Sequence, residues 1–164
     1  MRAAVLTVSD GVSAGTREDT SGDVLEELLA GEGFEVERRV VPDDRDVIAD
    51  AIADLAGGAQ VVLTTGGTGL GPRDVTPEAT MRVCERLIPG FGELMRSASL
   101  EKTPMASLSR AQAATRGSAL VVNLPGSVNG ARENLQAVLH LIPHALELLS
   151  GKRVDHEGGG MRDA

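Results

Sequence analysis

Small and polar residues that can bind an anion are concentrated in one stretch of this 164-residue sequence, residues 64–76, which reads TTGGTGLGPRDVT. Its glycines allow backbone N–H groups to approach an anion closely, and its threonine hydroxyls add donors. The stretch is not a Walker A loop, because no Gly-Lys pair precedes a Ser or Thr, and it is not the dinucleotide fingerprint. It predicts a phosphate or nucleotide site, with a set of tight turns as the alternative.

Two aspartates stand beside such loops. Asp43 follows Pro42, and Asp74 follows Arg73 at the end of the glycine-rich stretch. A carboxylate pair without His or Cys suits a hard cation such as Mg²⁺, which bridges carboxylate and phosphate oxygens. The alternative to metal binding is a structural role for each residue: Asp43 would cap the helix that follows it, and Asp74 would stabilise a turn or cap the next helix.

These residues need a scaffold, and four segments are predicted to be its strands: residues 3–8, 34–41, 61–65 and 119–124. Three of them are continuous runs rich in Val and Leu, which is typical of parallel strands covered on both faces. The second, residues 34–41, alternates apolar and charged side chains, so we expect it near an edge of the sheet.

Amphipathic segments predict helices over residues 21–30, over 44–56, from residue 76 onward, and over 127–149. We expect Thr20 and Asp23 to cap the first helix, Thr76 to cap the third and Pro143 to bend the last. The less regular residues 89–116 are expected to form helix, loop and helix, with the Ala-rich residues 109–114 in the second helix.

The alternation of strands and helices predicts an α/β fold: three layers, doubly wound, with a mostly parallel sheet and helices on both faces. One domain is expected over residues 1–154. Residues 155–164 contain three consecutive glycines and mixed charges, and are expected to form a flexible tail.

The polar loops should converge. In an open α/β sheet, ligands bind beyond the carboxyl ends of the strands. The segments that follow the four predicted strands are all polar, and three of them are rich in glycine: residues 9–16, 42–44, 64–76 and 123–127. The sequence therefore predicts one site at that edge of the sheet.

Composition limits the function further. A formal net charge of −8 disfavours binding to nucleic acid or to anionic membranes. The absence of Trp and Tyr means that a bound ring must be held without stacking on either. Cys84 is the single cysteine, which excludes an internal disulfide and a Cys-based metal centre. No apolar run reaches membrane-spanning length and no signal peptide is evident, so we expect a cytoplasmic protein.

The loops resemble those of a known family. Residues 64–69 (TTGGTG) followed by 72–79 (PRDVTPEA) resemble the signature of the molybdenum-cofactor biosynthesis proteins MogA and MoaB. Residues 89–93 (PGFGE), 108–110 (LSR) and 123–126 (NLPG) are also similar to theirs. The resemblance extends over about residues 2–153, and its third-loop motif is highly specific.

The resemblance implies a three-layer α/β subunit, assembled as a homotrimer with a hexamer as the alternative. It also implies adenylyl transfer: molybdopterin and ATP give adenylyl-molybdopterin and pyrophosphate with the help of Mg²⁺. Asp43 and Asp74 occupy the positions of the two aspartates that support this step in the family. The Arg-Asp, Thr-Pro-Glu-Ala and Leu-Ser-Arg pieces look more like MogA than MoaB.

The remaining site residues are expected on the same basis. Ser109, Arg110 and Ser118 are candidates for the pterin side, and Asn123, Pro125, Gly126 and Ser127 for the nucleotide side. The others are expected to provide donors near the substrates or to form the rim: Ser9, Asp10, Ser13, Thr65, Gly66, Gly67, Thr68, Gly69 and Arg73.

Two rival functions stay open. One is a MoaB-like protein that binds molybdopterin or a nucleotide without efficient turnover. The other is a structural α/β oligomer whose glycine loops only form turns.

Overall fold

The computed structural model describes residues 1–151, and within them six strands form one sheet in the order β2-β1-β3-β6-β5-β4. The parallel part has four strands: β1 (Arg2–Val8), β2 (Glu35–Val41), β3 (Val61–Thr65) and β6 (Ala119–Leu124). The other two, β5 (Gln112–Arg116) and β4 (Arg86–Leu87), extend it antiparallel. The predicted mostly parallel sheet is confirmed, and β2 lies at an edge as its alternation indicates.

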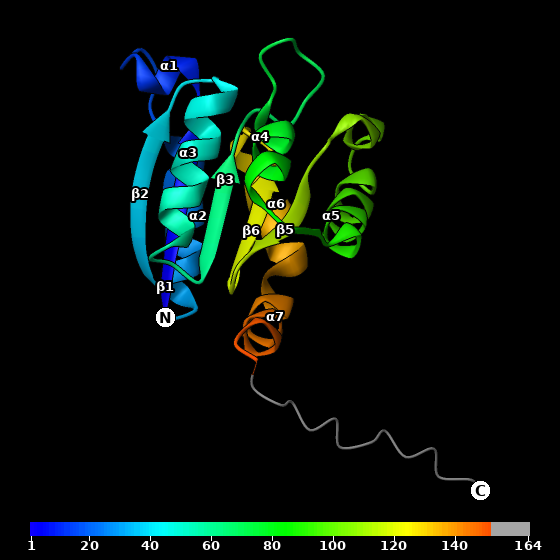
Figure 1. The fold of residues 1–164 in the computed structure, drawn as a ribbon. Helices are drawn as coiled ribbons and strands as arrows, with labels where there is room; N and C mark the ends of the chain where they lie inside the picture. Colours follow the sequence, from blue (N-terminus) through cyan, green and yellow to red (C-terminus); the bar gives the residue numbers. More distant parts are fainter. Residues whose placement is uncertain (152–164) are drawn as a thin grey trace, which may run out of the picture.

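Helices cover both faces of this sheet (Figure 1). One face carries α2 (Thr20–Gly31), α5 (Pro89–Leu100), α6 (Val128–Val138) and α7 (Ile142–Leu149), and the other carries α3 (Arg45–Ala56) and α4 (Thr76–Val83). Side chains alternate along each strand, so Ala3 and Val5 join one apolar core while Ala4 and Leu6 join the other. The three-layer architecture is therefore confirmed.

The predicted helix over residues 109–114 is wrong. Residues 112–116 form β5 instead, paired antiparallel with β6 from Gln112 opposite Asn123 to Arg116 opposite Ala119. Ala113 and Ala114 are completely buried on opposite faces of the sheet. Tertiary packing thus overrides the helical preference of alanine.

Helix ends also differ from prediction. Asp19, not Thr20, caps α2 by accepting the N–H of Gly22. Thr76 is the first residue of α4 rather than its cap. The segment predicted as one bent helix over residues 127–149 is broken into α6 and α7 by a 3-10 turn, Leu139–Leu141, and Pro143 lies in the first turn of α7.

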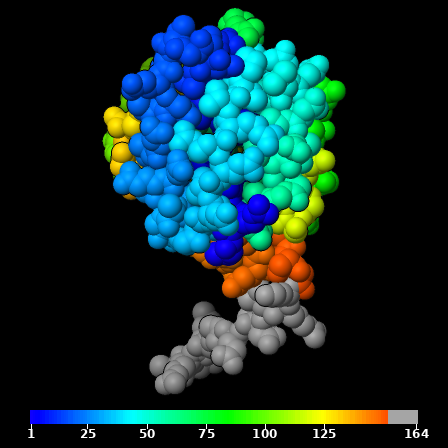
Figure 2. Space-filling model, turned by 90° about the vertical axis from the view of Figure 1, so that its left-hand side faces the viewer, coloured from blue at the N-terminus to red at the C-terminus, as the bar shows by residue number. Residues whose placement is uncertain are grey.

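Two short segments complete the fold near the carboxyl ends of the strands. They are α1 (Asp10–Ser13), directly after β1, and the 3-10 helix η1 (Pro104–Leu108), after α5. Figures 1 and 2 show α1 and the loop after β3 at the same end of the molecule, opposite α7. The predicted tail, residues 155–164, lies outside the described residues. Within residues 1–151, no helix has the length and apolar character needed to cross a membrane.

Candidate active site

Two adjoining pockets lie at the carboxyl edge of the sheet. The larger, of about 640 Å³, is bounded by the loop after β3, by the α5–η1 segment and by the start of α6. The smaller, of about 400 Å³, is bounded by the ends of β1 and β3, the α1 segment and the start of α2. Four residues line both pockets and so form their common border: Gly67, Asp74, Gly126 and Ser127.

Glycine is required where the loop after β3 turns. Gly66 and Gly67 have φ angles of 104° and 70°, which favour glycine. A Cβ on Gly66 would lie 2.2 Å from the carbonyl oxygen of Val8, and one on Gly67 would lie 2.2 Å from Thr76 Oγ1. Because Thr76 Oγ1 also donates to the carbonyl oxygen of Gly66, the loop is fixed onto the start of α4.

The same loop presents free donors at the border. The N–H groups of Gly67, Thr68 and Gly69 donate no hydrogen bond to any of residues 1–151. Successive unpaired N–H groups in a glycine turn are an anion-binding arrangement. This geometry favours the phosphate site over the alternative of turns alone.

Asp43 is held by α1 rather than by its own helix. The N–H of Asp10 donates to Asp43 Oδ2 (2.9 Å), and the N–H of Asp43 donates to Asp10 Oδ1 (3.0 Å). The N-cap of α3 is Asp44, so the alternative role of Asp43 as a helix cap is wrong. Arg73 Nε and Nη2 bind the carboxylate of Asp10 at 2.6 and 2.9 Å, which joins this pair to the loop after β3.

The pKa values of Asp10 and Asp43 shift in opposite directions. Hydrogen bonds from Arg73 lower the pKa of Asp10. Burial raises the pKa of the half-buried Asp43, and the charges of Asp10 and Asp74 contribute to the rise, although the N–H from Asp10 opposes it. A nearby cation would therefore stabilise the ionised form of Asp43.

The carboxylate of Asp74 accepts a hydrogen bond from its own loop. The N–H of Gly71 donates to its Oδ2 at 2.8 Å, and a Cβ on Gly69 or Gly71 would lie within 3 Å of that oxygen. Oδ1 accepts no hydrogen bond from the described residues. Asp74 lines both pockets, whereas Asp43 lines only the smaller.

The aspartate pair has the donor chemistry for Mg²⁺. Within residues 1–151, neither Asp43 nor Asp74 forms an ion pair with a basic side chain, and no group of three or more His, Cys, Asp or Glu is placed to hold a metal. A pair of carboxylates is a normal protein contribution to a Mg²⁺ site, because this ion takes its other ligands from water and substrate phosphates.

Arg110, a candidate for the pterin side, contacts the loop after β3. Its Nε donates to the carbonyl oxygen of Gly69 (2.9 Å), its Nη2 donates to that of Asp74 (2.6 Å), and its Nη1 pairs with Glu78. It lines neither of the two pockets. Arg110 therefore fixes the loop that carries Asp74, and its role on the pterin side stays a prediction.

Asn123 is also a packing residue. It is completely buried, and its Nδ2 donates to Thr64 Oγ1 and Thr80 Oγ1, which ties β6 to β3 and α4. Its neighbours Pro125, Gly126 and Ser127 do line the larger pocket, where Ser127 caps α6 by accepting the N–H of Gly130. Of this loop, it is therefore the second half that borders a pocket.

The other predicted residues differ in which pocket they line, and some line neither. Ser109, Thr68 and Gly69 line the larger pocket, and Ser9, Thr65 and Gly66 line the smaller. Ser118 is exposed in the turn between β5 and β6, at the opposite end of these strands, because the chain reverses there. Ser13 is exposed at the end of α1 and, like Arg73 and Asp10, lines neither pocket.

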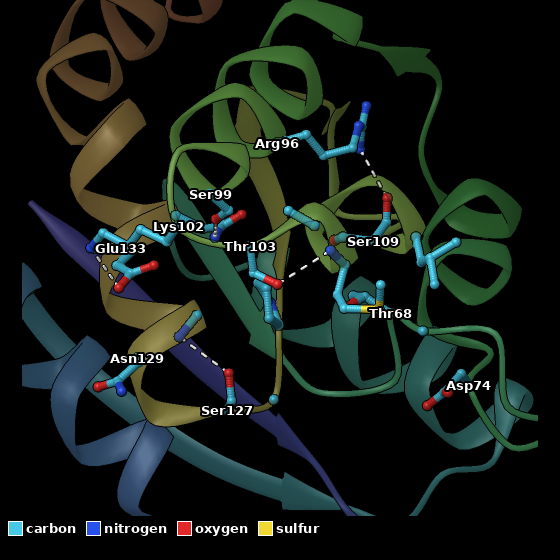
Figure 3. A pocket seen from close by; sticks show the side chains of 18 of the residues that line it. Thr68, Asp74, Arg96, Ser99, Lys102, Thr103, Ser109, Ser127, Asn129 and Glu133 are labelled. Atoms are coloured by element: carbon cyan, nitrogen blue, oxygen red, sulfur yellow. Dashed lines mark hydrogen bonds and ion pairs between the residues drawn. The ribbon is translucent and has the colours of Figure 1, made fainter.

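Sequence reasoning missed most of the wall of the larger pocket. Lys102 and Glu133 form an ion pair on one side of it, with Asp74 on the other (Figure 3). Its remaining unpredicted members are Arg96, Ser99, Thr103, Met105, Ala106, Leu108, Asn129, Gly130 and Asn134. They come from α5, η1, the segment between these two and α6, and polar residues on amphipathic helices look like ordinary surface residues in a sequence.

The smaller pocket has unpredicted residues too: Val12, Arg17, Glu18, Thr20 and Ser21, together with Thr7 and Val8 of β1. Ser21 shares a hydrogen bond with Thr65 Oγ1, which also donates to the carbonyl oxygen of Pro125. Sequence position could have indicated two of these residues, because Arg17 and Glu18 directly follow the first polar loop, residues 9–16.

Comparison with known proteins gives a consistent result. The family model described as "Probable molybdopterin binding domain" matches residues 4–144. A molybdopterin adenylyltransferase of Helicobacter pylori (strain J99) is 43% identical over 152 residues, which cover 90% of this chain and 86% of that protein. One of Escherichia coli (strain K12) is 37% identical over 172 residues, covering 94% of this chain and 88% of that protein.

A solved structure agrees with both the fold and the sequence. The crystal structure of the molybdopterin biosynthesis enzyme MoaB from Thermus thermophilus matches with a TM-score of 0.84 and 51% identity. The match covers 92% of this chain and 97% of that one.

Proposed function

This chain belongs to the family described as "Probable molybdopterin binding domain", as the resemblance of its loops predicted, and we propose that it is a molybdopterin adenylyltransferase of molybdenum-cofactor biosynthesis. Relatives of that name are 37–43% identical over most of the chain. The proposed substrates are molybdopterin and ATP.

In the proposed reaction, an oxygen of the molybdopterin phosphate attacks the α-phosphorus of ATP. A phosphorus–oxygen bond forms there, the bond from the α-phosphorus to the bridging oxygen breaks, and pyrophosphate leaves with the electron pair. Both reactants are anionic, so positioning and charge neutralisation dominate the catalysis. When bound, Mg²⁺ held by Asp43 and Asp74 would offset the repulsion between the phosphates.

The common border of the two pockets is the observation that carries this proposal. A transfer between two phosphorylated substrates needs two adjoining sites whose phosphates meet. Gly67, Asp74, Gly126 and Ser127 line both pockets, and the N–H of Gly67 is unpaired among the described residues. The N-terminus of α6, capped by Ser127, adds a favourable field for an anion there.

The apolar part of the larger pocket can hold a ring without aromatic stacking. Met105 and Leu108 of η1 are 63% and 51% exposed, although they are large apolar side chains, and both line that pocket. Asn129 lines the same pocket as a partner for the polar edge of a ring system, beside Ser99 and Asn134, which are joined by a hydrogen bond from Asn134 Nδ2 to Ser99 Oγ.

A MoaB-like binding protein without efficient turnover is the second candidate. The 51% identity to the Thermus thermophilus enzyme MoaB favours it. The two candidates share the substrates and differ in whether pyrophosphate is released.

The test is an incubation of the purified protein with molybdopterin, ATP and Mg²⁺, followed by measurement of pyrophosphate. We expect release by the wild type and by Asp50→Asn, an exposed carboxylate of α3, and no release by Asp74→Asn, which should still bind molybdopterin. If the wild type binds molybdopterin but releases no pyrophosphate, the binding protein is the correct function. If neither substrate raises the melting temperature, both candidates fail.

The proposed assembly is a homotrimer, with a hexamer as the alternative, and the proposed location is the cytoplasm. The subunit mass is 17.0 kDa. Sedimentation equilibrium should therefore give three times this mass for the trimer or six times for the hexamer, and a value of one subunit would contradict both.

A further inference from the structure

One basic side chain of the site has no protein partner within residues 1–151. Of the cationic residues that line the two pockets, Lys102 pairs with Glu133, and Arg96 donates to the carbonyl oxygens of Ser109 and Ala111. Arg17 lines the smaller pocket, and its guanidinium forms no hydrogen bond or ion pair with any other described residue. Arg17 is exposed, so its guanidinium is a cation that this pocket can offer to an anionic ligand.

The position of Arg17 depends on Gly11. The N–H of Arg17 donates to the carbonyl oxygen of Gly11, and its side chain runs across this glycine. A Cβ on Gly11 would lie 2.7 Å from Arg17 Cδ and 3.1 Å from Cγ. The missing side chain at position 11 therefore provides the space in which Arg17 reaches the pocket.

The smaller pocket has the polar lining that the phosphate chain of a nucleotide needs. The large apolar side chains of η1 line only the larger pocket, whereas hydroxyls of Ser9, Thr20 and Ser21 line the smaller. In the proposed transfer, the two reacting phosphates must lie at the common border. The remaining phosphates of ATP then have to extend away from it.

We propose that Arg17 binds the β- and γ-phosphates of ATP, the part that leaves as pyrophosphate. The inference rests on the proposed function and adds to it a residue that contacts the leaving group. A planar guanidinium matches phosphate oxygens with two parallel hydrogen bonds. Negative charge develops on the leaving pyrophosphate as its bond to the α-phosphorus breaks, and a cation there stabilises that charge.

The test compares ligands that contain or lack these phosphates. Calorimetric titration with Mg-ATP, Mg-pyrophosphate and AMP is carried out on the wild type and on Arg17→Ala. We expect ATP and pyrophosphate to bind about ten- to a hundredfold more weakly to the variant, as for loss of a charged hydrogen-bonding group. Affinity for AMP should change less than about twofold, since AMP has neither phosphate.

Two further variants control this comparison. Arg82→Ala removes the same charge from α4, where Arg82 pairs with Asp46 outside both pockets, and should leave all three affinities unchanged. Gly11→Ala keeps Arg17 but fills the space beneath it, and should weaken ATP binding in the same direction. Because both changes act through the side chain of Arg17, the double variant should bind ATP as tightly as Arg17→Ala does.

The outcomes separate this inference from the proposed function. Equal weakening of ATP and AMP, or no weakening of either in Arg17→Ala, overturns the role of Arg17 while wild-type transfer leaves the function intact. Failure of the wild type to bind ATP at all overturns both. An additive double variant overturns the dependence on Gly11, and with it the structural basis of the proposal.

Discussion

Replacing Arg110 by alanine gives a specific test of how the loop after β3 is held. The family resemblance makes this residue a candidate for the pterin side, and in the structure its guanidinium binds the carbonyl oxygens of Gly69 and Asp74 and the carboxylate of Glu78. We therefore expect Arg110→Ala to loosen the loop, displace Asp74 and lower both stability and turnover.

The magnitude follows from those contacts. A hydrogen bond that involves a charged group contributes about 1.5–3 kcal/mol, whereas a surface ion pair contributes about 0–1 kcal/mol. The Arg110 side chain is 32% exposed, so solvent weakens each contact, and the sum is about 2–4 kcal/mol of the free energy of unfolding. For a chain of this size, that corresponds to a fall in Tm of roughly 5–15 °C.

Turnover should fall further than stability implies. A catalytic group displaced by about 1 Å loses on the order of a hundredfold in rate. We expect kcat to fall by about this factor for Arg110→Ala, with smaller changes in the KM values for both substrates. Circular-dichroism melting and pyrophosphate release measure the two effects on the same samples.

Arg116→Ala is the matched control. Arg116 also lies half-buried and donates to a backbone carbonyl, that of Val83, but at the far end of β5. It should lower Tm and leave kcat unchanged. If Arg110→Ala instead leaves Tm and kcat unchanged and raises only the KM for molybdopterin, the assignment of Arg110 to the loop is wrong.

Three further predictions follow from local geometry. Gly67→Ala should lower stability by about 2–4 kcal/mol and abolish turnover, because the new Cβ meets Thr76 Oγ1 in a left-handed conformation; urea unfolding measures this, and an unchanged midpoint would contradict it. Asp43→Asn should abolish turnover yet melt no lower than the wild type at neutral pH. Folding raises the pKa of Asp43, so this carboxyl stabilises the folded state at a pH below its unfolded pKa, and the stabilisation is lost as the pH rises through its folded pKa. Any excess of the variant's Tm over that of the wild type should therefore vanish in acid. Burial raises the pKa of the Cys84 thiol to about 11, so iodoacetamide should label the native protein about a hundredfold more slowly than the unfolded chain, and equal rates would refute a buried thiol.

The sequence was sufficient for the layers of the fold because its strands carry strong local signals. Runs such as residues 61–65 are apolar throughout most of their length and become central parallel strands, buried on both faces. Residues 112–116 lack such a signal. Ala113 and Ala114 prefer helix by themselves, and only pairing with β6 makes them a strand, so local propensity could not predict it.

The site was predictable where one loop carries it and unpredictable where it depends on contacts between distant residues. Gly67 and Asp74 of residues 64–76 line both pockets, while Gly66 and Gly69 line one each. The pairing of Asp10 with Arg73 joins residues 63 positions apart, and no local pattern indicates it. Asn123 and Arg110 have the residue types of ligand-binding groups, but burial and backbone partners assign them to structure.

Transfer of the adenylyl group, which carries the α-phosphate of ATP, is the central claim, and a single-turnover experiment tests it most directly. Enzyme in excess over ATP labelled at the α-phosphorus is mixed with molybdopterin and Mg²⁺, quenched at intervals and analysed for labelled product. The account predicts that the label appears in adenylyl-molybdopterin with the wild type and not with Asp74→Asn. Wild-type protein that binds both substrates and leaves all label in ATP would contradict it.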